Sequence, residues 1–227
     1  MARSFNGTSA YLSVTDNDAI TCPNGDWSIA GWIKPAALPL GTPEFFYCAG
    51  NYGVPSFLSI HIGTASNTIT VLAFSDDFAF KYLNHADAEV TEGTWHHILV
   101  RNDGDDFQLY TDGVQRANNN TAWGSINPGA PLLFGNNSQL LEQSFFNGDL
   151  AEWAKWDSAL TAPQIAQLVD GESPLAVGSP AWCIPMQGDD YAGKVVPLSV
   201  TNSGTTDSAH PPQMYAPRRR KLMQLVG

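Results

Sequence analysis

Apolar residues occupy both faces of the segment from residue 27 to residue 35. Side chains alternate between the two faces of a β-strand. Ile29 and Ile33 fall on one face, while Ala30 and Trp32 fall on the other. A strand that is apolar on both faces belongs in the covered centre of a sheet. We therefore expect residues 27–35 to form a central strand.

Two more strand-like segments, residues 95–101 and 107–111, are separated by a short polar turn. The pair Asp112-Gly113 follows the second segment. Asp-Gly favours a two-residue hairpin turn, because both central positions of that turn need positive φ angles. The stretch therefore predicts an antiparallel meander that ends with a third strand at residues 114–117.

One segment has the period of a helix. Thr161 and Gln164 have the spacing of a capping box, and Pro163 falls in the first turn, where its missing N–H costs little. Apolar residues at helical spacing and a terminating glycine follow: Ile165, Leu168, Val169 and Gly171. The pattern predicts a short helix that ends at the glycine.

Turn-forming pairs punctuate the remaining chain at short intervals. They are Asn6-Gly7, Asn24-Gly25, Asp112-Gly113 and Asn147-Gly148. Regular punctuation of short apolar runs is typical of a β-sandwich or jelly roll. A chain of 227 residues is long enough to bury a sizeable core as one such domain.

Three stretches resemble one family in their order and spacing. They are residues 27–35 (WSIAGWIKP), 93–113 (with GTWHHILV and LYTDG) and 146–160 (beginning FNGDLAEW). Together they resemble the laminin-G-like, concanavalin A-like lectin/glucanase jelly roll. The resemblance implies an all-β, two-sheet sandwich with one short helix over residues 1–200. That fold hosts lectins, glycosidases and structural modules, so the fold alone does not decide the function.

Charge divides the chain into an acidic body and a basic end. All 22 acidic residues lie at or before Asp207, whereas four of the 11 basic residues lie at positions 218–221. An acidic body repels nucleic acid, so we expect no direct nucleic-acid partner. No apolar run approaches the roughly 20 residues of a membrane span.

We expect residues 201–227 to form an extended C-terminal arm, because they contain too few apolar residues for a core of their own. A basic segment on an acidic protein suggests docking to a complementary surface. The residues predicted to anchor the arm are Arg218, Arg219, Arg220, Lys221, Leu222 and Leu225. The expected partners are neighbouring copies or a major capsid or tail protein.

The carboxylates argue against an enzyme. Glycosidases need two of them flanking the scissile bond. The nearest pair, Asp149 and Glu152, has a spacing that places the two on opposite faces of a regular strand. His96 and His97 are likewise adjacent and cannot clamp one metal together. We therefore expect no catalytic residues and no zinc site.

Two binding sites are left as expectations. Laminin-G-like domains often bind calcium at a rim, and Asp103, Asp105 and Asp106 offer oxygen ligands for it. No other cofactor is expected. A glycan site would use an aromatic ring beside amides, which predicts a site in the loop of residues 118–130. Its residues are Trp123, Asn118, Asn119 and Asn120.

The N-terminal residues, MARSFNG, have no apolar signal core. We therefore expect synthesis in a reducing host cytoplasm, with Cys22, Cys48 and Cys183 as thiols. A domain of this kind that starts at Met1 resembles the lectin-fold proteins of bacteriophage particles. The resemblance implies a virion-surface decoration or tail protein. A lectin-like carbohydrate-binding module is the alternative, and a divergent glycosidase is a third.

Overall fold

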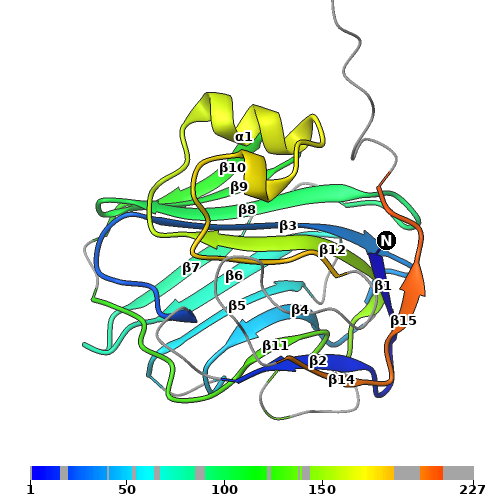
Figure 1. Ribbon diagram of the computed structural model, residues 1–227. Helices are drawn as coiled ribbons and strands as arrows, with labels where there is room; N and C mark the ends of the chain where they lie inside the picture. The colour runs from blue at the N-terminus through cyan, green and yellow to red at the C-terminus, as the bar shows by residue number, and fades with distance from the viewer. Residues whose placement is uncertain are drawn as a thin grey trace, which may run out of the picture.

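A computed structural model describes residues 2–15, 20–39, 41–52, 55–63, 67–84, 90–121, 124–137, 139, 144–186 and 200–211. Within these residues, two antiparallel sheets pack face to face, and one α-helix lies on the outer side of the larger sheet (Figure 1). The two-sheet sandwich with one short helix, predicted from the sequence, is confirmed.

The larger sheet has eight strands in the order β10-β9-β8-β3-β12-β1-β15, with β13 pairing to β12. Their bounds are β1 Ala2–Asn6, β3 Trp27–Pro35, β8 His96–Asp103, β9 Asp106–Thr111, β10 Val114–Asn119, β12 Asn147–Trp156, β13 Trp182–Ile184 and β15 Thr206–Ser208.

The smaller sheet has seven strands in the order β14-β2-β11-β4-β5-β6-β7. Their bounds are β2 Tyr11–Val14, β4 Glu44–Ala49, β5 Phe57–Ile62, β6 Ile69–Phe74, β7 Phe80–Asn84, β11 Leu132–Phe134 and β14 Val200–Ser203.

Strand β3 is the covered central strand that its pattern predicts. It pairs with β8 on one side and β12 on the other, and every residue except Lys34 is buried. Its inner face joins the core between the sheets through Ile29 and Ile33, whereas Ala30 joins the cluster beneath the helix. The predicted meander is also confirmed, as β8, β9 and β10.

Helix α1 (Ala162–Val169) covers the outer face of the larger sheet (Figure 1). The backbone N–H of Thr161 donates to the side-chain oxygen of Gln164 at 2.9 Å, as the capping-box spacing predicts. Ile165 and Leu168 bury the helix's apolar face in a cluster with Trp156. A short 3-10 helix, Pro174–Ala176, follows.

The tryptophans divide between core and surface. Trp27, Trp32 and Trp153 are buried, as their strand positions predict. Trp95, at the start of the strand-like segment 95–101, is only partly buried. It precedes β8, which starts at His96. Its ring packs with Trp32 in a small cluster apart from the core between the sheets, and the Lys34 ammonium lies 6.0 Å from its centroid.

The C-terminal segment corrects the predicted start of the arm. Residues 201–208 are not an extended arm, because β14 pairs with β2 in one sheet and β15 pairs with β1 in the other. An ion pair of Arg3 with Asp207 at 3.2 Å reinforces the second contact. Residues 200–211 therefore belong to the sandwich (Figure 1). The predicted anchor residues from Arg218 to Leu225 lie outside the described residues.

Cys22, Cys48 and Cys183 are all buried as thiols. Burial raises the pKa of the Cys22 thiol to about 12, so the reactive thiolate is scarce at neutral pH. None of the helices in the described part of the chain has the length and apolar character that crossing a membrane requires.

Candidate functional site

The outer face of the seven-stranded sheet carries an unusual set of side chains. Leu58, Ile60 and Ile62 of β5 belong to the core between the sheets. Because side chains alternate along a strand, Phe57, Ser59 and His61 face outward. The same alternation on β6 and β7 places every second residue of these strands outward. The outward residues are Thr70, Leu72, Phe74, Phe80, Tyr82 and Asn84.

Strand register arranges these side chains in three rows across β5, β6 and β7. The first row is aromatic and consists of Phe57, Phe74 and Phe80. The second is mixed and consists of Ser59, Leu72 and Tyr82. The third is polar and consists of His61, Thr70 and Asn84. Successive rows on one face lie about 6.5–7 Å apart along the strands.

The aromatic row belongs to a longer aromatic strip, which we define as Tyr52, Phe57, Phe74, Phe78, Phe80 and Tyr82. Ring centroids in the strip are 5.3 Å apart for Tyr52–Phe57, 6.2 Å for Phe57–Phe74 and 6.0 Å for Phe74–Phe80. Phe78 meets Phe74 at 6.1 Å.

Three members of the strip are widely open to solvent. Phe78 is 73% exposed, Phe80 is 55% exposed and Tyr82 is 47% exposed. Phe78 also has a φ angle of +66°, which is unfavourable for a side chain of its size. Contiguous exposed apolar surface of this kind is typical of surfaces that bind a ligand or a partner.

The polar row forms a pocket of about 200 Å³ beside the strip. Its lining residues are Pro43, His61, Gly63, Thr68, Thr70, Leu72, Tyr82 and Asn84. Tyr82 belongs to both features, so strip and pocket are continuous. The Asn84 amide donates to the Tyr82 hydroxyl at 2.7 Å and orients it. None of these lining residues is Asp, Glu, Lys or Arg.

His61 is the pocket's least satisfied group. It is 5% exposed, its ring lies 4.6 Å from that of Phe45, and its Nδ1 has no hydrogen-bond partner among the described residues. Burial lowers the pKa of His61 to about 4, so the imidazole is uncharged at neutral pH.

The glycan loop predicted from the sequence reaches the end of this surface. The turn at residues 75–79, which carries Phe78, is tied to that loop by three hydrogen bonds. Asp76 N–H donates to the Ser125 carbonyl at 2.8 Å, and the Ser125 hydroxyl donates to Asp76 Oδ2 at 3.0 Å. Gly124 N–H donates to Asp77 Oδ1 at 3.2 Å. The loop therefore borders the strip.

The predicted loop residues themselves have other partners. Asn118 donates to Asp106 at 3.1 Å, and Asn119 Oδ1 accepts the Thr121 N–H at 3.0 Å. Asn120 is exposed, and Trp123 lies outside the described residues. The predicted loop borders the strip, but the sequence analysis did not identify the strip itself, although Phe80, Tyr82 and Asn84 already alternate in the sequence.

The acidic turn predicted for calcium has a different arrangement. Asp103 pairs with Arg101 at 3.5 Å, and Asp106 accepts a hydrogen bond from Asn118. In the described part of the chain, His, Cys, Asp and Glu side chains do not gather in threes or more as a metal would require. Calcium binding at Asp103, Asp105 and Asp106 therefore stays a prediction.

The two carboxylates, Asp149 and Glu152, lie on a strand whose regular alternation is interrupted. A β-bulge interrupts β12 between Ala151 and Ala154, and Glu152 within it has a φ angle of +52°. Glu152 is buried and meets His210 Nε2 at 3.4 Å, while Asp149 pairs with Lys34 at 3.4 Å. Each carboxylate thus has a cationic or ionisable partner of its own, and neither lines the polar pocket.

Known proteins resemble this chain in sequence and in fold. The model of the concanavalin A-like lectin/glucanases superfamily matches residues 6–166. The mouse neuronal pentraxin receptor is 31% identical over 100 residues, which are 40% of this chain and 20% of the receptor. The chain thus matches about a fifth of that relative's length.

Two solved structures share the fold. A protein of Bacteroides ovatus described as carbohydrate binding superposes with a TM-score of 0.70 at 17% identity, over 90% of this chain and 58% of its own. A heptameric pentraxin of Limulus polyphemus superposes with a TM-score of 0.60 at 18% identity, over 90% and 93% of the two chains. The family resemblance predicted from the sequence is confirmed.

Proposed function

The chain belongs to the concanavalin A-like lectin/glucanase superfamily, and from that premise we propose that it is a non-enzymatic module that binds uncharged saccharides. The binding surface is the aromatic strip together with the polar pocket. The observation that carries the proposal is the ordering of the three rows. On one sheet face, the mixed row that contains Tyr82 lies between the aromatic row and the polar row.

This ordering matches the two faces of a sugar ring. The C–H groups of a pyranose or furanose can pack on the rings of Phe80 and Tyr82, and its hydroxyls can pair with Thr70, Asn84 and His61. Aromatic side chains supply apolar contact at a low cost in conformational entropy, because they have only two rotatable χ angles. A few placed polar groups then fix orientation, as in most small-molecule sites.

The lack of charge favours neutral sugars. The residues that line the pocket include no lysine or arginine to pair with a sugar carboxylate. His61 is uncharged at neutral pH, as its lowered pKa shows. The chain also carries a formal net charge of −11, which repels anions at long range.

On a glycan array at pH 7, we expect hits among neutral oligosaccharides and none among uronic or sialic acid glycans.

Removing the exposed ring of Tyr82 tests the site. Tyr82→Ala is expected to weaken affinity for the best neutral ligand at least about tenfold, which corresponds to about 1.4 kcal/mol. The matched control is Leu175→Ala, which removes another exposed apolar side chain. Leu175 lies in the 3-10 helix that follows α1, away from the strip. Calorimetric titration should show the loss for Tyr82→Ala alone, with equal melting temperatures. Equal affinities of the two variants would refute the site.

We also expect no hydrolysis. The residues lining the pocket hold no carboxylate pair, and glycosidases of the usual kind need one. Incubating the protein with each bound glycan and measuring new reducing ends should give no signal above buffer. Turnover that disappears in Asp149→Ala or Glu152→Ala would overturn the non-enzymatic assignment.

The virion role and the partners expected from the sequence remain predictions. These are attachment to a capsid or tail protein, location on a virion surface, and contact with neighbouring copies. Calcium binding at Asp103, Asp105 and Asp106 is a prediction of the same kind. The saccharide proposal depends on none of them, because the strip and pocket lie on other strands.

A further inference from the structure

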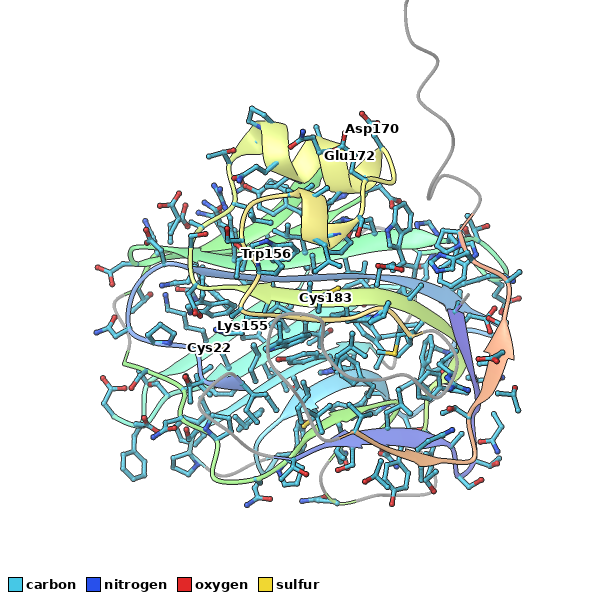
Figure 2. The ribbon with its side chains drawn as sticks, in the orientation of Figure 1. Cys22, Lys155, Trp156, Asp170, Glu172 and Cys183 are labelled. Atoms are coloured by element: carbon cyan, nitrogen blue, oxygen red, sulfur yellow. The ribbon has the colours of Figure 1, made fainter. Side chains whose placement is uncertain are left out.

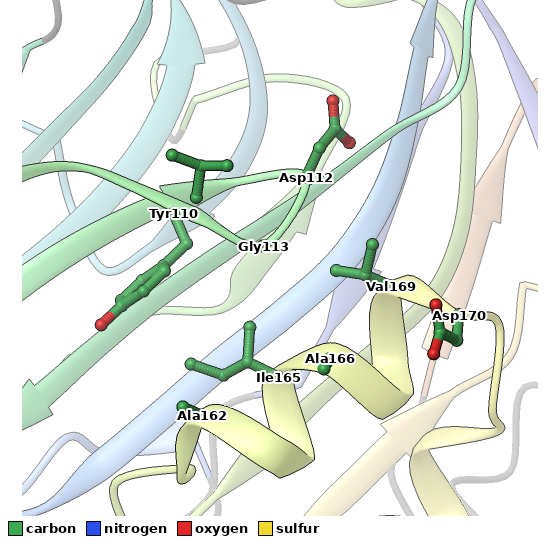
Figure 3. Close-up of a pocket in the computed structure, with 9 residues that line it drawn as sticks. Tyr110, Asp112, Gly113, Ala162, Ile165, Ala166, Val169 and Asp170 are labelled. Atoms are coloured by element: carbon green, nitrogen blue, oxygen red, sulfur yellow. The ribbon is translucent and has the colours of Figure 1, made fainter.

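A groove opens between helix α1 and the β9–β10 hairpin (Figure 3). Helix α1 covers the outer face of the larger sheet, whereas β5, β6 and β7, which carry most of the aromatic strip, belong to the smaller sheet (Figure 1). Its volume is about 270 Å³. The lining residues are Tyr110, Asp112, Gly113, Val114, Ala162, Ile165, Ala166, Val169 and Asp170. Apolar side chains form most of this lining, and Val114 is 51% exposed.

The groove is acidic at one end. Asp112 lies on the hairpin, and Asp170 caps the C-terminal end of α1 (Figure 3). Burial acts to raise the pKa of Asp112, but hydrogen bonds from His96 and the His97 N–H outweigh it and lower that pKa. Glu172 follows the helix close to Asp170 (Figure 2). The exposed carbonyls of a helix C-terminus add partial negative charge.

The chain itself contains a segment of matching chemistry. Residues 218–221 are Arg-Arg-Arg-Lys, and residues 222–226 are Leu-Met-Gln-Leu-Val. These residues lie outside the described part of the chain. Four cations followed by three branched apolar side chains are complementary to a groove with an acidic end and an apolar floor.

Strand register shows that this segment can reach the groove from its own chain. His210 meets Glu152 on β12, and β12 is separated from β9 by β3 and β8. Three strand spacings of about 4.8 Å amount to roughly 14 Å. The seven residues between His210 and Arg218 span up to about 23 Å when extended. Tethering at this length also gives a high effective concentration.

We propose that the C-terminal segment of residues 218–226 docks, in its own molecule, into the groove between α1 and the β9–β10 hairpin. Lys221 and the arginines then meet Asp170, Glu172 and Asp112. Leu222, Leu225 and Val226 cover the apolar lining. The docked segment leaves the aromatic strip open, because the two surfaces lie on opposite faces of the sandwich.

Zero-length cross-linking of the full chain tests the contact. A carbodiimide joins a lysine amine directly to a carboxylate that touches it. Peptide mass spectrometry is expected to find Lys221 joined to Asp170, Glu172 or Asp112. Mixing ¹⁴N-labelled and ¹⁵N-labelled protein before the reaction distinguishes the two arrangements. Docking within one molecule gives products of a single label. Mixed-label products would instead show that the segment docks into a second copy, which overturns the proposal as stated.

A matched pair of variants locates the receptor surface. Val114→Arg places a cation in the groove and is expected to reduce the Lys221 cross-link at least about fivefold. Leu175→Arg makes the same change at an exposed apolar residue outside the groove and should leave the yield unchanged. Equal yields in both variants, or Lys221 joined only to other carboxylates, or no Lys221 product at all, would each reject the proposal.

Discussion

Replacing Trp153 by alanine is expected to lower the free energy of unfolding by about 3–5 kcal/mol, the usual range for a buried tryptophan. The ring is fully buried between the sheets and meets three other aromatic rings. It stacks on Tyr47 at 5.6 Å and contacts Phe134 at 5.7 Å and Phe46 at 5.8 Å. Thermal melting and urea unfolding should both show the loss.

Two companion variants make this prediction specific. Trp95→Ala removes an equal ring from a partly buried position and should cost clearly less. Gly31→Ala should be destabilising in the parent, because an added Cβ would lie 2.3 Å from the Trp153 ring. In the Trp153→Ala background that penalty should vanish. If the effects of the two substitutions on the free energy of unfolding are additive instead, Gly31 and the Trp153 ring are not in the tight contact described here.

Acidification is expected to destabilise the protein between about pH 6.5 and pH 4, through His61 and His97. Burial lowers the pKa of each to about 4, and for His97 a smaller opposing effect comes from Asp112. The unfolded chain takes up protons below about pH 6.5, while the native imidazoles stay neutral down to about pH 4. The unfolded state therefore gains relative stability as the pH falls, by up to about 3 kcal/mol per histidine.

Because carboxylates also titrate toward the acidic end of this range, the measurement is a comparison of slopes. Unfolding free energies are determined in urea at pH 7, 6, 5 and 4 for the parent, His61→Gln and His97→Gln. The unfolding free energy of each variant should fall less between pH 7 and pH 4 than that of the parent, whatever the variant's stability at pH 7. A variant whose stability falls with pH as steeply as that of the parent would show that its histidine protonates normally in the native state.

The neighbourhood of the candidate site was predictable, but its main surface was not. The loop of residues 118–130 was recognised from one tryptophan beside three asparagines. That loop does border the turn that carries Phe78. The strip itself combines residues from β5, β6, β7 and the segments around them. Only the register between those strands places Phe57, Phe74 and Phe80 in one row.

The groove between α1 and the β9–β10 hairpin was likewise only partly predictable from the sequence. Capping and periodicity predict α1, and Asp-Gly predicts the β9–β10 hairpin, so both of its walls are visible in the sequence. Their approach to each other is not, because it depends on helix packing over the outer face of β8, β3 and β12. The contact of Val169 with Gly113, where a Cβ would lie 3.3 Å from Val169 Cγ2, is a result of that packing.

Local rules determined the parts of the fold that depend on neighbours in sequence. They are the central strand β3, the meander β8–β10, the helix with its capping box and the sandwich class. Each rests on a periodicity or a turn geometry that acts over a few residues.

Tertiary structure decided the burial and pairing of residues for which the local pattern is ambiguous. Alternation alone would bury Phe80 and Tyr82 and expose Lys81, and the fold does the reverse. The Lys81 ammonium donates to the carbonyls of Asp105 and Asn119, at 2.9 and 3.2 Å, and these belong to the edge of the other sheet. Likewise, residues 200–208 lack a core of their own and become strands because β2 and β1 offer open edges. Partners distant in sequence satisfy these groups, so their placement could not be derived from the local pattern.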